Sequence, residues 1–495
     1  MQTETHLHRY LLAEKAFSRI QVFEQRATVG GIWNYIPCPE GAPQDQAIPQ
    51  TNPFAGLDEP IWDNSNAKDT LSKEDREEAS FLSPLYDRLE TNIPRGLMGF
   101  SDLPWPETAQ LFPKHAQVQK YIEDYSQDVR HLINFETQVI DLQQHPSGSW
   151  ILKTQPITRN ANAEVQTHHF EAIVLANGHF NIPYIPSVPG LSAWSAAHPG
   201  TITHSKFYRL PEAYASQKVI IVGNSASGID IASQIALHSK PPLLISSKSE
   251  SFLQSGETPP DQLDKPPIAK FIIEDRTVEF QDGSRESHVD AVLYCTGYFY
   301  SFPFVSEDLS PALTTTGERV ENLYKHLFYR PNPTLALPVL NQKVIPFPFA
   351  EAQAAVMARV FSGRLELPSQ KEMEEWEKRE VEEKGGGRGF HVLKFPKDAE
   401  FINEMHDWAV GAEGEGQGVE GEGGKDAVVG KKPPYWGERE FWTRERFPAI
   451  KKAFQGFGER RHEVRTLSEV GFDFEAWKEE KDREGKRLLQ ELVNV

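Results

Sequence analysis

The sequence predicts an α/β fold with parallel sheets, followed by a mainly helical C-terminal extension. Three apolar runs each stop at a glycine: AIVLANGHF (172–180), KVIIVGNSASG (218–228) and AVLYCTGYF (291–299). Continuous apolar runs are typical of strands that are buried on both faces, as in a parallel sheet covered by helices. The middle run opens directly into a helical pattern, IDIASQIALHS, and so completes a strand–loop–helix unit.

The loop of that unit has the spacing of a dinucleotide phosphate loop. In VIIVGNSASGIDIA, Gly223 permits a tight turn after the strand and Gly228 permits close packing of the helix. Ser225 takes the place of the middle glycine, so the pattern is GxSxxG, and Ser227 lies beside it. A diphosphate would bind at the N-terminus of the helix, where N–H groups are unpaired and the dipole is positive.

The next strand indicates which dinucleotide this loop would take. It ends in LLISSKSE (243–250), with Ser246, Ser247 and Lys248 at the position where an acidic residue would select a free 2′-hydroxyl. Hydroxyls and a cation favour a 2′-phosphate instead, which predicts NADP. The competing interpretation of Lys248 is a solvated surface lysine.

A second unit is indicated near the N-terminus, in IQVFEQRATVGGIW (20–33). Its short apolar run ends at Glu24, as does the second strand of a Rossmann unit whose acidic residue binds a ribose hydroxyl. The glycine loop should lie about 20 residues earlier, but residues 1–19 contain no glycine and residues 8–18 have helical character. We therefore expect the chain to start inside the first helix of this unit. The alternative is an ordinary helix and strand with a surface glutamate.

Composition excludes several classes of protein. The net charge of −19 argues against general binding to nucleic acid or an anionic membrane. Two cysteines cannot form a disulfide framework, and the histidines lack metal-ligand spacing. No apolar run is long enough to span a bilayer and no signal peptide is visible, so a soluble cytoplasmic protein without a metal is expected.

The remaining chain predicts fewer elements. Residues 36–80 read as a long loop region, residues 116–133 as a helix, and Val139–Leu142 with Trp150–Thr154 as paired strands. After residue 370 charge rises, and the glycine- and glutamate-rich stretch at about 409–432 is expected to be disordered. Neither this stretch nor GGGRG (385–389) follows a strand, so neither is a phosphate loop.

With these motifs placed, residues 8–375 resemble the flavin-containing monooxygenases, in particular their fungal branch. GTITHSKFY fits the family signature GxxxHxxxY through Gly200, His204 and Tyr208, although His198 stands where the family usually has phenylalanine. LYDRLETNIPRGLMGFSDLPWP (85–106) is similar to the family segment around an asparagine beside the flavin, which matches Asn92.

The resemblance implies FAD and NADP as cofactors. It implies an FAD domain in two parts (1–185 and 299–370), an NADP domain (186–298) and a charged extension (371–495). Beyond the loop residues above, it implies cofactor contacts from Glu24, Gly30, Gly31, Trp33, Val139, Gly178, Thr296, Gly297 and Gln353, with Gln353 expected at a helix start near the flavin.

The implied chemistry is flavin-dependent monooxygenation. In this family NADPH reduces FAD, molecular oxygen forms a C4a-hydroperoxyflavin, and a small soft nucleophile, an amine or a sulfur compound, takes one oxygen atom. Asn92 would take a catalytic role beside the flavin; a turn residue before Pro94 is the competing interpretation. His204 and Tyr208 would bracket a phosphate, or would form a structural pair at a domain hinge.

Three other functions are alternatives to N- or S-oxygenation by a flavin. A disulfide reductase would need two neighbouring cysteines, which the sequence lacks. A Baeyer–Villiger monooxygenase shares the two-domain plan, although HSKFY fits the N- and S-oxygenating branch better. The third alternative is an impaired NADP-binding protein without flavin. The sequence leaves substrate identity and oligomeric state open.

Overall fold

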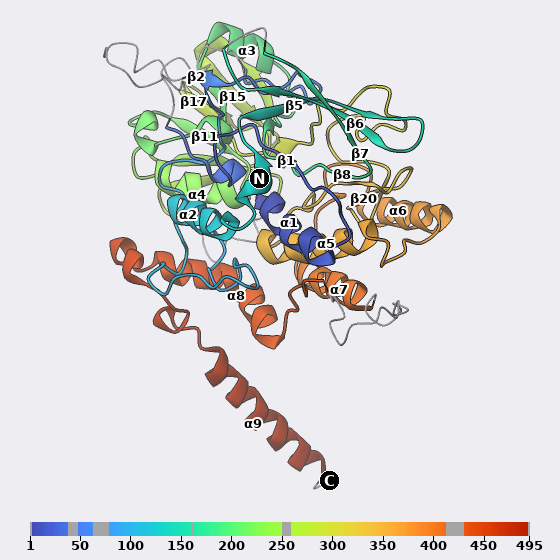
Figure 1. Ribbon diagram of the computed structural model, residues 1–495. Helices are drawn as coiled ribbons and strands as arrows, with labels where there is room; N and C mark the ends of the chain where they lie inside the picture. Colours follow the sequence, from blue (N-terminus) through green and yellow to red (C-terminus); the bar gives the residue numbers. More distant parts are fainter. Residues whose placement is uncertain are drawn as a thin grey trace, which may run out of the picture.

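The structure is a computed structural model that describes residues 2–37, 48–62, 79–159, 163–249, 259–411 and 430–493. Figure 1 shows a compact body of sheets and helices, from which the last helix projects away on its own. The helices are α1 (Gln2–Glu14), α2 (His115–Ser126), α3 (Leu191–Ala197), α4 (Ala226–Ile235), α5 (Pro346–Phe361), α6 (Gln370–Lys384), α7 (Lys397–Gly411), α8 (Glu438–Gln455) and α9 (Phe474–Val493).

The main sheet has five parallel strands, in the order β10-β17-β11-β12-β13. Its strands are β10 (Ile202–His204), β17 (Ala291–Tyr294), β11 (Val219–Val222), β12 (Leu243–Ser246) and β13 (Gln262–Lys265). The predicted strand–loop–helix is therefore confirmed, with α4 following β11. A second, antiparallel sheet packs nearby and contains β14 (Ile268–Ile272), β15 (Thr277–Phe280) and β16 (Arg285–Glu286).

The predicted N-terminal unit also has parallel pairing, but in two separate pieces. In one piece β1 (Val22–Phe23) pairs with β4 (Ile133–Asn134). In the other, β8 (Ile173–Val174) pairs with β21 (Leu335–Ala336), which continues to β20 (Phe328–Tyr329) and β19 (Leu323–Tyr324). Among the described strands, β1 and β8 each have one neighbour, and the residues of both line the same cavity.

Several sequence expectations need correction at their boundaries. The helix expected at 116–133 ends at Ser126, and residues 133–134 form β4 instead. The helix expected at 8–18 begins at Gln2 and ends at Glu14. The expected pair of strands is confirmed as β5 (Thr137–Gln144) and β6 (Trp150–Pro156), with β7 (Gln166–Phe170) added at the edge.

Smaller strand pairs complete the part of the chain that the structure describes. Within the region expected to be loop, β2 (Ile61–Trp62) pairs with β3 (Ala79–Ser80). Further along, β9 (Ile182–Pro183) pairs with β18 (Tyr298–Phe299) and so joins the chain segments on either side of the five-stranded sheet.

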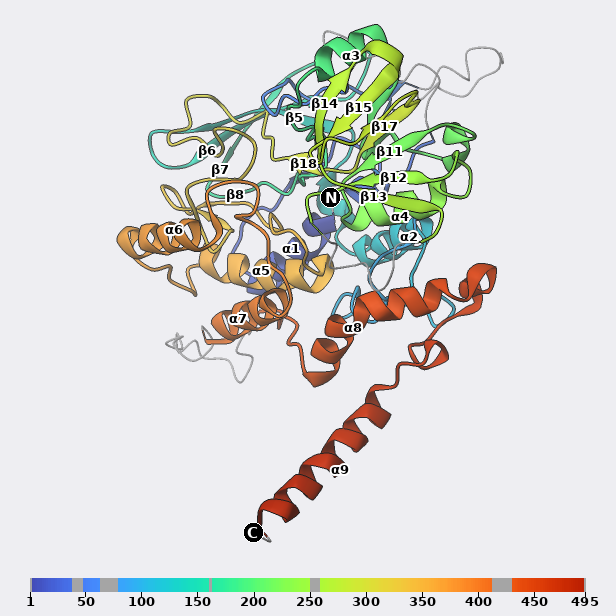
Figure 2. The same cartoon turned by 180° about the vertical axis from the view of Figure 1, so that it is seen from behind.

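Helix α5 is the centre of the largest core cluster. It is apolar on almost every side and packs between α1 and α7, as Figures 1 and 2 both show. Its one buried carboxylate, Glu351, accepts hydrogen bonds from the backbone and hydroxyl of Ser101, both at 2.8 Å, and from Lys431 Nζ at 2.9 Å. Because an unpaired buried charge is costly, this pairing stabilises the junction of three chain segments.

The C-terminal extension folds onto this core through α6, α7 and α8. Of the stretch expected to be disordered, residues 412–429 lie outside the described residues. The expectation was wrong at both ends: residues 409–411 belong to α7, and Lys431 binds Glu351. None of the helices described is both long enough and apolar enough to cross a lipid bilayer.

The loop glycines generate a first prediction. A Cβ at Gly228 would lie 2.0 Å from the carbonyl oxygen of Gly223, so Gly228→Ala must displace α4 from β11. Overpacking of this kind costs about 1–3 kcal/mol, and we expect a clearly lower melting temperature by circular dichroism. Gly386→Ala is the control, because its Cβ would meet only Val381 at an ordinary 3.8 Å. Equal melting temperatures for the two variants would contradict this packing.

Buried histidines make the stability of the fold depend on pH. Burial lowers the pKa of His204 to about 3, that of His8 to about 3 and that of His179 to about 4. Each is therefore neutral when folded but titrates near 6.5 when unfolded. Below that pH the unfolded chain binds more protons, so the free energy of unfolding falls as pH falls.

We expect the melting temperature to drop between pH 7 and pH 5. One such histidine contributes about 2 kcal/mol of this loss between pH 7 and pH 5. His204→Gln lowers stability at pH 7 but also reduces the pH slope by about one proton. His145→Gln, at an exposed site, serves as the control and keeps the full slope. A slope unchanged by His204→Gln would show that His204 is not buried in its neutral form.

Candidate functional site

The phosphate loop lies between β11 and α4. As predicted, Gly223 forms the tight turn after the strand and Gly228 permits the helix to pack closely on it. Gly223 has a positive φ of 102°, and its N–H donates to Ser246 O at 2.8 Å. A Cβ on Gly223 would lie 2.8 Å from Cys295 O, so the loop passes close to the end of β17. Ser225 caps α4 without a side-chain hydrogen bond, and both Ser225 and Ser227 are exposed at this helix N-terminus. The arrangement suits a diphosphate.

The end of β12 presents the residues predicted to bind a 2′-phosphate. Lys248 is exposed and Ser247 is half-buried. Asn224 Nδ2 donates to Ser249 O at 2.7 Å and so joins the phosphate loop to this segment. Ser246 is oriented differently: it is fully buried and its hydroxyl donates to Pro266 O at 2.9 Å. The structure thus leaves Lys248, but not the Ser246 hydroxyl, open to an anion.

The turn after β17 is held by hydrogen bonds from several elements. The carbonyl oxygen of Gly297 accepts the backbone N–H of Tyr184 at 2.9 Å and Nε2–H of His204 at 3.0 Å. The hydroxyl of Thr296 donates to Tyr184 O. Thr296 and Gly297, both predicted cofactor contacts, therefore lie in a fixed turn where the chain leaves the five-stranded sheet. We call residues 296–298 the hinge turn.

Arg388 completes this turn, and no pattern in the sequence predicted it there. Its guanidinium donates to Thr296 O at 3.1 Å and to Tyr298 O at 3.2 Å, and it stacks over Tyr184 at 3.7 Å. Arg388 belongs to GGGRG, which does not follow a strand and therefore does not have the context of a phosphate loop. Only the return of the C-terminal extension brings this cation to the hinge turn.

His204 acts as a neutral positioning group at the hinge turn. It is fully buried, its Nδ1 accepts the N–H of Lys206 at 3.1 Å, and its Nε2 therefore carries the proton. Tyr208 packs elsewhere, with its hydroxyl 3.1 Å from Gln234 Oε1 of α4. The two do not share a helix face, since His204 ends β10 and a 3-10 turn separates them. Gly200 has φ 78° in the exposed turn before β10.

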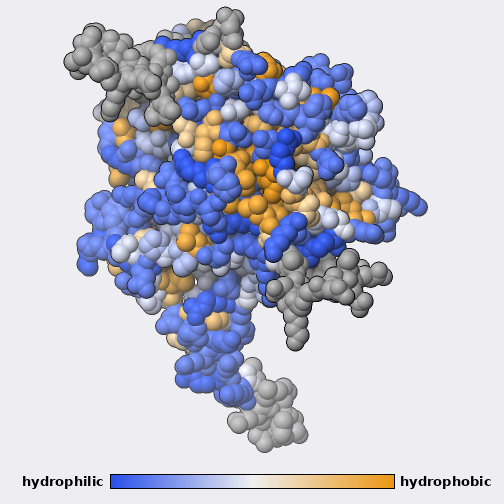
Figure 3. Space-filling model, viewed as in Figure 1, coloured by the Kyte–Doolittle hydropathy of each residue, from blue (hydrophilic) through white to orange (hydrophobic). Residues whose placement is uncertain are grey.

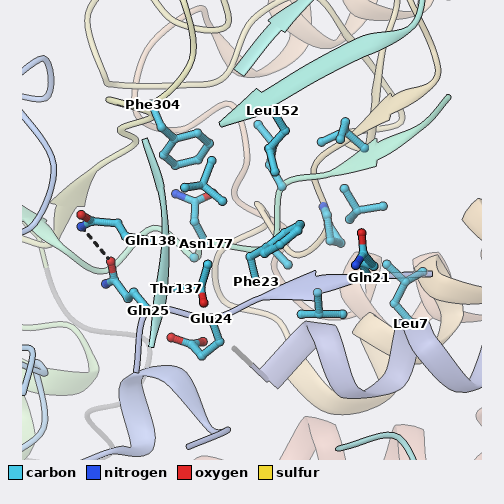
Figure 4. A pocket seen from close by; sticks show the side chains of 18 of the residues that line it. Leu7, Gln21, Phe23, Glu24, Gln25, Thr137, Gln138, Leu152, Asn177 and Phe304 are labelled. Carbon is cyan, nitrogen blue, oxygen red and sulfur yellow. Dashed lines mark hydrogen bonds between the residues drawn. The ribbon is translucent and has the colours of Figure 1, made fainter. Parts of the chain in front are cut away.

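A cavity of about 960 Å³ lies beside β1 and β8. Of the residues predicted to bind FAD, it is lined by Glu24, Trp33, Val139 and Gly178. Glu24 is 3% exposed at the end of β1, and its Oε1 accepts the backbone N–H of Arg26 at 2.8 Å. Figure 4 shows Glu24 and Thr137 close together, with Phe23 and Asn177 beside them. Apolar side chains gather around this region in Figure 3.

Gly30 and Gly31 are buried and begin the short 3-10 turn Gly31–Trp33, outside the cavity lining. A Cβ on Gly30 would lie 2.0 Å from Oε1 of Gln119 on α2. Gly30 therefore permits close contact with α2, and this contact places Trp33 against the cavity.

One wall of the cavity carries a cluster of hydrogen-bonded polar side chains that no sequence pattern indicated. Asn181 Nδ2 donates to both oxygens of Asp58, at 2.7 and 2.8 Å, and Lys206 Nζ donates to Asn181 Oδ1 at 2.6 Å. Gln138 Nε2 donates to Asp58 O at 2.9 Å and to Gln25 Oε1 at 3.3 Å, the dashed line in Figure 4. Burial lowers the pKa of Lys206 to about 8. These residues come from distant segments, so no local pattern could reveal them.

Asn92 is half-buried and lies outside the lining of this cavity. Its segment is fixed by backbone hydrogen bonds from Thr91 N to Pro113 O, at 2.9 Å, and from Arg95 N to Leu111 O, at 2.8 Å. The structure therefore positions Asn92 firmly but does not bring it to the cavity wall.

Gln353 is fully buried in the middle of α5, so its expected place at a helix start was wrong. Its Oε1 accepts the N–H of Val339 at 2.8 Å, and Val339, with φ 56°, lines the cavity. Gln353 thus acts on the cavity through Val339 rather than directly.

The described residues fit part of an FAD molecule. The cavity is large enough for a flavin, and Glu24 offers a buried carboxylate to a ribose hydroxyl. Among the described residues that line the cavity, the glycines are Gly56 and Gly178, which lie in different segments. A glycine-rich turn for the diphosphate is not present in the described lining.

Comparison with known proteins agrees with this architecture. The family Flavin-binding monooxygenase-like (FMO-like) matches residues 56–258 and 265–413. A flavin-containing monooxygenase of Arabidopsis thaliana, FMO GS-OX-like 7, is 32% identical over 375 residues, 72% of this chain and 71% of the relative. The flavin-containing monooxygenase iboF of Amanita muscaria is 28% identical, covering 80% of this chain and 84% of the relative.

Solved structures give the same result. S-allyl-L-cysteine S-oxygenase from Allium sativum superposes with a TM-score of 0.71 at 25% identity, covering 95% of this chain and 94% of the other. Tmm from Pelagibacter has a TM-score of 0.64 at 19% identity, over 91% and 89% of the two chains, which shows the fold alone. Members of this family use FAD and NADP as cofactors. This chain belongs to the flavin-binding monooxygenase-like family.

Proposed function

We propose that this protein is an NADPH-dependent monooxygenase that transfers one oxygen atom from O2 to the nitrogen or sulfur of a small soft nucleophile. The observation that carries the proposal is the cavity bordered by Glu24, joined through the hinge turn to a sheet with an intact phosphate loop. FAD, when bound, supplies the oxygen-activating chemistry. The chain's own residues would bind the two cofactors, orient them and exclude water.

Sulfur is the substrate atom that the comparisons favour. The relative from Allium sativum is described as an S-oxygenase of S-allyl-L-cysteine, and its structure superposes over nearly the whole chain. The cavity lining is largely apolar, with Leu7, Phe23, Leu152 and Phe304 among its side chains (Figure 4). The uncharged sulfur of a thioether group suits such a lining better than the nitrogen of a protonated amine does, because burying a charge is costly.

A second candidate is an NADP-binding protein without flavin. One specific observation favours it, namely the split between β1 and β8 beside a cavity whose described lining lacks a diphosphate turn. The NADP-side loop is independent of this split, since it belongs to the five-stranded sheet. The two candidates therefore differ in flavin content, not in NADP binding.

The choice of dinucleotide can be tested at Lys248. We expect Lys248→Ala to raise the Kd for NADPH about tenfold, equivalent to about 1.4 kcal/mol, because a charge-assisted contact with the 2′-phosphate is lost. The Kd for NADH should stay unchanged. The control is Lys240→Ala, an exposed lysine before the opposite end of β12. Equal losses for NADPH and NADH would contradict a 2′-phosphate site.

The reaction is tested on the purified full chain, supplied with FAD and then desalted. We expect a flavin absorption band that bleaches with NADPH and returns in air, and a sulfoxide from S-allyl-L-cysteine that is 16 mass units heavier, the mass of one oxygen atom. Cyclohexanone is the comparison substrate. A lactone without a sulfoxide would support the Baeyer–Villiger class instead. NADPH binding without any flavin would support the second candidate.

A further inference from the structure

The C-terminal extension reaches the segment that carries Asn92. Helix α8 and the turn after it follow residue 413, where the family match ends. In Figures 1 and 2 α8 lies against the pale-blue segment around residue 100. Two contacts fix this arrangement: Leu111 N donates to Val464 O at 2.9 Å, and the rings of Phe112 and Phe454 lie 4.8 Å apart.

One buried side chain of α8 touches the residue before Asn92. Lys451 Nζ donates to the backbone carbonyl of Thr91 at 2.8 Å, and its ammonium lies 4.6 Å from the ring of Phe112. That carbonyl belongs to the peptide unit that also contains the N–H of Asn92. Because a peptide unit is planar, fixing the direction of its C=O also fixes its N–H and the position of the next Cα. Lys451 therefore controls the backbone from which the Asn92 side chain projects.

Burial lowers the pKa of Lys451, and two acidic groups, Asp230 and Glu90, oppose this shift by favouring the charged form. Glu90 lies 3.9 Å from Lys451 Nζ and also pairs with Arg461 at 3.1 Å. Asp230 of α4 interacts electrostatically with Lys451 and accepts hydrogen bonds from Tyr86 and Gln234. A buried ammonium needs such partners, since an unpaired one would lose its proton. The network connects α4, α8 and the Asn92 segment.

We propose that Lys451 is a positioning residue for Asn92, which it holds through the carbonyl of Thr91. The inference rests on the proposed function and on the sequence-based expectation that Asn92 acts beside the flavin, although Asn92 itself lies outside the lining of the cavity. It assigns a role to α8 in the reaction, although α8 lies outside the part of the chain that matches the family.

The first test needs no cofactor. Hydrogen exchange is measured on peptides from residues 86–98 in the wild type, Lys451→Met and Lys452→Met. Losing the Thr91 contact should accelerate exchange of the Thr91 and Arg95 amides at least about tenfold, since their bonds to Pro113 and Leu111 loosen. Lys452→Met, at an exposed neighbouring position of α8, should leave exchange unchanged.

The second test is the coupling of NADPH oxidation to oxygenation in the FAD-loaded chain. We expect Lys451→Met to lower the yield of sulfoxide per NADPH about tenfold and to release hydrogen peroxide instead, with the KM for NADPH unchanged. Lys451→Arg keeps a charged donor and should restore most of the yield. Arg461→Met, which removes a partner of Glu90 but not the Thr91 contact, should retain more of the yield than Lys451→Met.

The outcomes separate this inference from the proposed function. Unchanged exchange and coupling in Lys451→Met would overturn the inference. Losses in Arg461→Met equal to those in Lys451→Met would also overturn it, because they would indicate a general effect of the charge network. Intact coupling in Asn92→Ala would overturn the expected catalytic role of Asn92 beside the flavin and would leave the proposed function standing. If Lys451→Met does not fold, Lys451→Gln is used, and the same exchange criteria apply.

Discussion

The fold depends on the hydrogen bonds that converge on the carbonyl of Gly297. Two N–H groups from different segments, Tyr184 and His204, donate to this one oxygen. Arg388 and Thr296 fix the peptide units around it. At this turn the chain leaves the five-stranded sheet and returns to the cavity, so its geometry sets how one binding unit meets the other. A neutral, buried histidine suits this place because it donates one hydrogen bond and accepts another without a charge.

The chain also holds its cavity together from outside the two binding units. Glu351 in α5 joins Ser101 to Lys431, and Lys451 in α8 joins the Asn92 segment to the C-terminal extension. In each case a buried charged side chain binds a group far away in the sequence, 250 positions for Glu351 and Ser101 and 360 positions for Lys451 and Thr91. Breaking either would leave an unpaired charge in the core, which costs several kcal/mol, so the extension is an integral part of the fold.

The glycine loop and the hinge show where sequence reasoning succeeds and where it ends. Gly223 and Gly228 could be assigned because the constraints on them are local: a positive φ in one case, close packing of a helix on its own strand in the other. The sequence left two roles for His204, binding a phosphate or a structural role at a domain hinge. Its hydrogen bond to Gly297 O favours the structural role. Arg388 could not be found, because its partners are about ninety residues away. Gln353 was misplaced, since α5 begins seven positions earlier at Pro346, where proline at the first turn is a local signal of a helix start.

The sequence by itself determined the α/β class, the strand–loop–helix of the NADP unit, the acidic end of β1 and the family. These features follow from the periodicity of apolar residues and from glycine spacing, which act over short distances. Only the tertiary structure decided that β1 and β8 border one cavity and that Ser246 faces the core. It also decided that Lys451 of α8 binds the segment that carries Asn92, and that Lys206 binds Asn181 in the cavity wall. Contacts between distant segments depend on how all the elements pack, and no local pattern encodes them.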